Sequence, residues 1–168
     1  NIFIQEPKPF VNNYKFIKGF EEGELKLNSM KIDNNSKSNL KITNFKVKEV
    51  PVLAKILILA SLQGIADLLT GEGIRFDEFE MDFKTKNNLI EIDELYALGP
   101  AISIMMEGYI EKDRITSLRG TLVPATTINK TISKIPLLGN ILVGSKTGEG
   151  VFGVSFKIKG PPNDLKSS

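Results

Sequence analysis

The chain contains no cysteine and no histidine among its 168 residues. Without cysteine it forms no disulfide and no thiolate metal site, and the redox compartment stays open, because an oxidising compartment permits disulfides without requiring them. Without histidine it lacks the commonest general base and the commonest metal ligand. We therefore expect a protein that is not an enzyme and that holds no metal or cofactor.

Long runs of one residue type are also missing. No window reaches the roughly 20 apolar residues of a membrane span, and the nearest, residues 50–69, contains Lys55, Gln63 and Asp67. The 22 basic and 20 acidic residues are interspersed, with no basic run longer than two, so nucleic acid is not an expected partner. The first residues, NIFIQEPKPF, lack the features of a signal peptide, and we expect the chain to be a piece of a longer protein.

The composition is that of one globular domain, with 41% hydrophobic and 25% charged residues. We expect this β-rich domain over residues 21–162. Residues 1–20 contain two prolines and read as an irregular lead-in, or as an edge strand around residues 14–17. The polar tail, residues 163–168, is expected to be frayed.

Residues 71–124 read as consecutive strands separated only by turns. Within residues 74–83 apolar side chains alternate with charged ones, which gives one apolar and one ionic face, and residues 152–158 alternate in the same way. We predict a mostly β fold with minor α structure: a curved, bulged antiparallel sheet of about eight or nine strands, with one main helix and one short helix.

Three irregularities in the alternation predict β-bulges, which would curve the sheet. In each, the apolar pattern skips one residue: near Asn28, between Ile42 and Phe45, and between Phe76 and Phe79.

Residues 51–69 form the predicted main helix, with Pro51 at its start and Gly71 beyond its end. Its wide apolar face favours burial against the sheet, and a membrane surface or lipid is the alternative. A short helix is expected from Thr126 or Thr127 to just before Pro136. Residues 34–39, NNSKSN, are expected to form the turn between the first two strands.

Two glycine-rich segments resemble nucleotide-binding motifs but fail on spacing or order. In residues 139–147, GNILVGSKT, Ser145 separates the second glycine from Lys146, and Gly148 follows where a helix is required. The GEG of residues 71–73 follows a helix and precedes a strand, which is the reverse of a dinucleotide fingerprint. We interpret the first as a plain loop and the second as a helix end and turn.

Neighbouring carboxylates are frequent in the strands, at Asp77 with Glu78, and at Glu91, Asp93 and Glu94. Without histidine or cysteine beside them, they indicate a solvated sheet face rather than an acid–base pair or a calcium site.

The order of several motifs is distinctive: GEGIRFDEF, then ELYALGPAISIMMEGYIE, then LRGTLVPATTINKTISKIPLLGNILVG, then GEGVFGVSFKIKGPP. This order resembles the C-terminal region of AsmA-like bacterial envelope proteins, in the form found in alphaproteobacteria, and the resemblance covers residues 50–162. Members of that family are anchored in the inner membrane and extend a curved β-sheet with an apolar inner face into the periplasm. They are implicated in phospholipid transport between the inner and outer membranes and in outer-membrane maintenance.

The resemblance implies phospholipid and the rest of the parent β-rich chain as partners, and membrane association through an anchor that this sequence lacks. A sheet of nine strands would be only about 40 Å wide, enough to hold lipid but not to bridge two membranes. The alternatives are a structural or assembly module whose apolar face is fully covered by its own helix and, less favoured, a hydrolase or nucleotide enzyme. The lipid-facing candidates are the apolar residues of the alternating strands: Ile74, Phe76, Phe79, Met81, Phe83, Ile90, Ile92, Ile102, Ile104, Met106, Phe152, Val154, Phe156 and Ile158.

Overall fold

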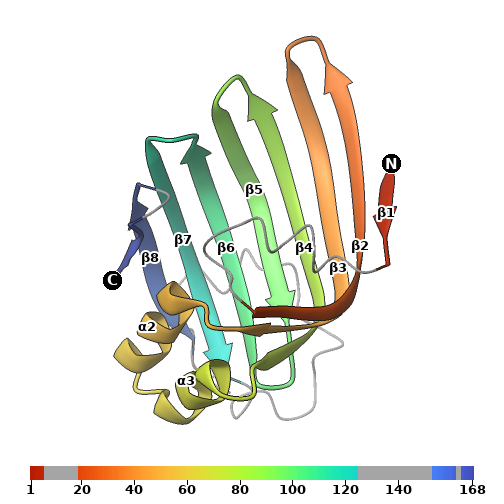
Figure 1. The fold of residues 1–168 in the computed structure, drawn as a ribbon. Helices are drawn as coiled ribbons and strands as arrows, with labels where there is room; N and C mark the ends of the chain where they lie inside the picture. The colour runs from red at the N-terminus through yellow and green to blue at the C-terminus, as the bar shows by residue number, and fades with distance from the viewer. Residues whose placement is uncertain (6–18, 125–152, 162–163) are drawn as a thin grey trace, which may run out of the picture.

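The computed structural model describes residues 1–5, 19–124, 153–161 and 164–168, and these residues form one open antiparallel sheet with two helices. Each strand pairs with the next one along the chain, so the spatial order is β1 to β9, a simple meander (Figure 1). The predicted fold class is confirmed. The elements are β1 (Ile2–Ile4), β2 (Gly19–Ile32), β3 (Asn35–Lys48), α2 (Pro51–Leu59), α3 (Gln63–Thr70), β4 (Ile74–Lys86), β5 (Leu89–Leu98), β6 (Ile102–Glu111), β7 (Ile115–Pro124), β8 (Val154–Gly160) and β9 (Lys166–Ser167).

The ends of the chain are more ordered than predicted. The edge strand β1 pairs with Leu25–Leu27 of β2, whereas the edge strand predicted around residues 14–17 lies outside the described residues. The tail predicted to be frayed instead contains β9, which pairs with Ile158 and Lys159. The predicted short helix after Thr126 also lies outside the described residues.

The first hairpin turns earlier than predicted. Its turn consists of Asp33 and Asn34, because Ile32 already pairs with Asn35. Asp33 adopts a φ of 54°, a left-handed conformation that Asp and Asn tolerate better than other non-glycine residues. The prediction of a turn over residues 34–39 was wrong because polar composition alone does not distinguish a turn from a polar strand end.

The bulge predicted near Asn28 is absent. The pairing of β2 with β3 continues without a shift from Glu24 to Ile32. The apolar pattern skips there because Met30 and Ile32 point to the opposite face of the sheet from Leu25, and they are 67% and 57% exposed. Single exposed apolar residues of this kind are normal in soluble proteins.

The other two predicted irregularities coincide at one level of the sheet. The pairing of β3 with β4 is interrupted where Asn44 faces Asp77, and it resumes in the same register on both sides. Asn44 has a φ of 54°. Because both strands carry an extra residue at this level, Ile42 and Phe45 lie on the same face of the sheet, as the skip predicted.

A bulge that was not predicted lies in β5. The register shifts there against both neighbouring strands, close to Asp93 and Glu94. As a result Ile92 and Leu95, three positions apart, are both buried.

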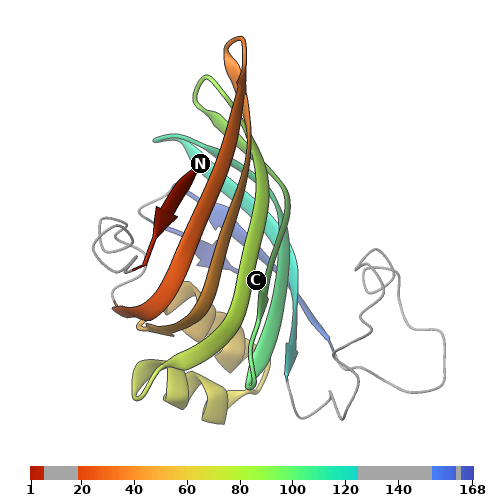
Figure 2. The ribbon, with the colours of Figure 1, turned by 90° about the vertical axis from the view of Figure 1, so that its right-hand side faces the viewer.

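The predicted single helix is two helices. α2 ends at Leu59 and α3 begins at Gln63, with Ser61 at a φ of 60° between them. Both helices lie at one end of the sheet and on one side of it, which we call the inner face (Figure 2). α3 contacts β3 and β4, and α2 contacts α3 and β9.

The main core lies between the two helices and the nearest end of the inner face. Phe45 stacks on Phe20 on one side and on Phe76 on the other, with ring centroids 5.3 and 5.5 Å apart. Leu57 of α2 and Leu69 of α3 are fully buried in the same cluster. The helices are therefore fixed to the sheet by apolar packing, at about 1.5–3 kcal/mol for each fully buried large side chain.

Candidate functional site

The register arranges the inner face in rows that run across the strands. Residues paired on neighbouring antiparallel strands point to the same face, so one residue of each row identifies the others. The row through Leu25 is apolar in all seven strands and is formed by Leu25, Ile42, Phe79, Ala97, Ile104, Leu122 and Val154. The inner face is thus the apolar face that the sequence predicted.

The structure divides the predicted lipid-facing residues into three groups, and Phe152 lies outside the described residues. The first group is buried and belongs to the main core or lies beside it: Ile74, Phe76, Ile92, Ile102, Ile104, Phe156 and Ile158. The second group is partly buried and packs against the main core: Phe79 and Met106. The third group is partly buried and lies outside that core: Met81, Phe83, Ile90 and Val154.

The third group identifies the accessible part of the inner face. Met81 and Phe83 lie in the second half of β4, and Ile90 lies at the start of β5. The end of β4 and the start of β5 are at the end of the sheet away from the two helices (Figure 1). We call these three residues the open inner surface. Most of the other predicted residues are core, so they hold the fold together and do not offer a surface to a ligand.

Two inner-face residues of β5 were missed by the sequence analysis. Leu95 and Ala97 are 7% and 6% exposed, and they follow Ile92 across the bulge. The signal was present, because the pattern Ile90, Ile92, Leu95, Ala97 contains the same skip of one residue that revealed the irregularity at Asn44.

On β2, β3 and β4 the inner face becomes polar at the end farthest from the helices, whereas on β5 the same rows contain Ile92 and Ile90. Ser29 and Ser38 form one cross-strand pair, and their hydroxyl oxygens are 2.8 Å apart. The next row begins with Lys31, Ser36 and Thr85 on three neighbouring strands. We call these five residues the polar corner. Sequence reasoning missed it, because its residues are brought together only when the first hairpin is extended to Asp33.

The outer face carries a polar network across β3, β4 and β5. Lys41 forms an ion pair with Glu78, and its Nζ lies 3.7 Å from Glu80. The Tyr96 hydroxyl donates its hydrogen bond to Glu80 and also lies 3.2 Å from a carboxylate oxygen of Glu78, and the amide of Asn39 donates a bond of 2.8 Å to Glu80. These bonds place Glu78 and Glu80 in cross-strand contacts on the outer face.

The network shifts the ionisation of its members. The hydrogen bonds from Tyr96 and Asn39, followed by the charge of Lys41, lower the pKa of Glu80 below its usual 4.5. The bond to Glu78 raises the pKa of Lys41. Burial and the bond to Glu80 raise the pKa of Tyr96. All three shifts favour the ion pair with a neutral tyrosine at neutral pH.

We predict that Tyr96→Phe lowers the free energy of unfolding by about 1 kcal/mol at pH 7, because Glu80 loses a hydrogen bond. A carboxylate whose folded pKa is depressed stabilises the fold above its unfolded pKa, and this contribution is lost as the pH falls through the folded value. The difference between variant and parent should therefore shrink below about pH 4. Urea unfolding at pH 7 and pH 3 measures it, and an equal difference at both values would contradict this account.

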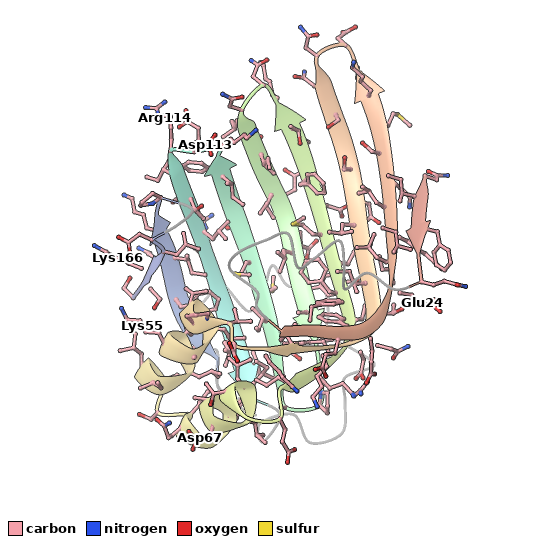
Figure 3. The ribbon with its side chains drawn as sticks, in the orientation of Figure 1. Glu24, Lys55, Asp67, Asp113, Arg114 and Lys166 are labelled. Carbon is pink, nitrogen blue, oxygen red and sulfur yellow. The ribbon has the colours of Figure 1, made fainter. Side chains whose placement is uncertain are left out.

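The helices expose apolar side chains as well. Ile58, Leu59 and Leu68 are 53%, 62% and 44% exposed, while Lys55 and Asp67 point away from the sheet (Figure 3). The apolar face of the predicted helix is therefore wider than the sheet covers. No helix among the described residues is long and apolar enough to cross a bilayer.

Within the described ranges, no group of three or more aspartate or glutamate side chains could hold a metal ion. The site that remains is a surface: the open inner surface, bounded by the helix-covered core on one side and by the polar corner on the other. No family model matches this chain, and neither a curated protein nor a solved structure matches it.

Proposed function

We propose that this chain is a lipid-holding segment of an AsmA-like envelope protein that faces the bacterial periplasm and contributes to phospholipid transport or outer-membrane maintenance. Its role is non-catalytic: acyl chains lie against the open inner surface, and the rest of the parent chain extends the sheet and carries the membrane anchor. The observation that supports this proposal is the position of the two helices, which cover one end of an apolar sheet face and leave Met81, Phe83 and Ile90 partly exposed.

An acyl chain requires a dry apolar surface and no polar chemistry. The open inner surface offers this, because Phe83 and Met81 lie in register with the buried Ile92 and Leu95 of the next strand. Burial of apolar area against such a surface contributes about 25 cal/mol per Å².

The alternative is a structural or assembly module whose apolar face is fully covered by its own helices. It predicts that side chains along the whole inner face are as buried as Ile74 or Ile102, which are at most 2% exposed. The partial exposure of the open inner surface favours the lipid proposal over this alternative.

The direct test is to purify the chain from cells and to look for co-purifying phospholipid by mass spectrometry. Protein that has been delipidated should take up phospholipid again. A chain that stays folded but neither retains nor takes up any lipid would count against the proposal for this segment.

We predict that Phe83→Asp reduces phospholipid uptake at least about tenfold while the protein stays folded. A carboxylate at this position has access to solvent in the free protein, but it would be desolvated beneath an acyl chain, at a cost of several kcal/mol. Uptake is measured by the mass of bound lipid, and folding by circular dichroism.

Two control variants, one on the exposed outer face and one in the core, are needed to interpret the result for Phe83→Asp. Met30→Asp adds the same charge on the outer face, at a position 67% exposed, and should leave uptake unchanged. Phe156→Asp adds it in the core, at a position 5% exposed, and should unfold the protein, because a buried unpaired carboxylate is not tolerated. If Phe83→Asp also unfolds the protein, Phe83 belongs to the core. The open inner surface would then not be the site that binds the acyl chains.

A further inference from the structure

The polar corner contains the one positive charge that the described part of strands β2–β5 places on the inner face beyond the irregularity at Asn44. Lys31 is exposed, and no ion pair joins it to a described residue. The inner-face rows from Leu25 to Lys31 contain no carboxylate on these four strands, because the register directs Glu78, Glu80 and Asp82 to the outer face. An anion that reaches this corner meets no acidic neighbour on the inner face.

Hydroxyl side chains occupy the same row as Lys31 and the row beside it, on three strands. Ser36 and Thr85 lie in register with Lys31, and Ser29 and Ser38 form the next row towards the helices. A hydroxyl can donate one hydrogen bond and an ammonium group three. Together they match the chemistry of a phosphate group, whose oxygens accept several hydrogen bonds and carry the opposite charge.

Apolar residues begin directly beside the corner. Phe83 pairs with Ser38, and Ile90 pairs with Thr85. From the level of Lys31 to that of Leu27, where Met81 ends the open inner surface, is four residues along β2 (31 − 27), or about 13 Å of strand, which is long enough for part of an extended fatty acyl chain. Along β2 and β4 the inner face changes from polar at Lys31 and Thr85 to apolar at Leu27 and Met81, which is the order of headgroup and tail in a phospholipid.

We infer that the polar corner binds the phosphate headgroup of an anionic phospholipid whose acyl chains lie on the open inner surface towards the helices. This inference rests on the proposed function and adds to it a headgroup class and the orientation of the lipid. Lys31 supplies the charge, and the hydroxyl groups of Ser36 and Thr85 fix the position of the phosphate.

The test uses the delipidated full chain and three lipids with the same oleoyl chains: phosphatidylglycerol, phosphatidylcholine and diacylglycerol. The parent protein should take up phosphatidylglycerol in preference to the other two. Lys31→Gln should reduce uptake of phosphatidylglycerol about tenfold, as expected for the loss of one charged hydrogen bond, and change uptake of diacylglycerol less than about twofold. The double variant Ser36→Ala, Thr85→Ala should reduce the preference without removing the charge.

Lys37→Gln is the matched control. Lys37 is an exposed lysine on the neighbouring strand β3, but it pairs with Met30 and therefore points to the outer face. Equal losses from Lys31→Gln and Lys37→Gln would overturn the inference in favour of a general charge effect. Equal uptake of all three lipids by the parent would overturn it while leaving the proposed function intact, whereas no uptake of any lipid would overturn both. Binding of free glycerol 3-phosphate that depends on Lys31, without lipid uptake, would identify a site for a soluble phosphate and also overturn it.

Discussion

Phe45→Ala is expected to lower the free energy of unfolding by about 3–5 kcal/mol, the usual cost of truncating a buried aromatic residue. Phe45 is the central ring of three, stacked between Phe20 and Phe76, and it also meets the edge of Phe79 at 6.4 Å. Its loss leaves a cavity between the sheet and the helices, and rigid strands on both sides cannot close it.

Urea unfolding followed by circular dichroism measures this change. Met30→Ala is the control, because Met30 lies on the same sheet but is 67% exposed, and it should change stability by no more than about 0.5 kcal/mol. Similar losses from both variants would mean that the aromatic stack does not hold the helix-covered end together. An intact helix signal in Phe45→Ala at low urea would show that the helices dock through other contacts.

The sequence predicted the architecture because one physical rule governs most of the chain. A strand with one buried face must alternate apolar and polar residues, and strands joined by short turns pair with their neighbours. The skip from Ile42 to Phe45 also predicted an irregularity in the pairing. It marks the level at which β3 and β4 each contain one extra residue. The same rule, applied to Ile92 and Leu95, would have revealed the bulge in β5.

The rule fails where an apolar residue is not buried. Met30 and Ile32 alternate like core residues but lie on the outer face, and only the register of the hairpin reveals this. The break between α2 and α3 at Ser61 was missed for a related reason. The residues on both sides of it are apolar, and an apolar segment of this length is compatible with one long helix or with two short ones.

The candidate site was only partly predictable, because the alternation identifies a face and not its accessible part. Phe76 and Phe83 have the same chemistry and lie on the same face of β4, yet Phe76 is 3% exposed and lies under the helices, whereas Phe83 lies beyond them. This difference comes from the place where α2 and α3 pack, which is a long-range property. The polar corner depends in addition on the pairing of three strands, which no local pattern contains.

Gly108→Ala, which adds a single methyl group, is expected to lower the free energy of unfolding by about 3 kcal/mol or more. Gly108 has a φ of 140°, a conformation that side chains rarely adopt. An added Cβ would lie 2.2 Å from the backbone oxygen of Ser117 and 2.9 Å from the Cα of Leu118. Since both neighbours are backbone atoms of β7, the clash is relieved only if β6 and β7 separate.

The matched control is Gly64→Ala in α3, where an added Cβ would meet nothing within 4 Å. There the methyl group should raise stability by about 0.5–1 kcal/mol, because glycine is a poor helix former and alanine the best. Glycine to alanine is thus expected to lower the free energy of unfolding in the sheet and to raise it in the helix. A folded Gly108→Ala protein with the parent's unfolding midpoint would contradict the close pairing of β6 and β7, and with it the continuous inner face on which a lipid would lie.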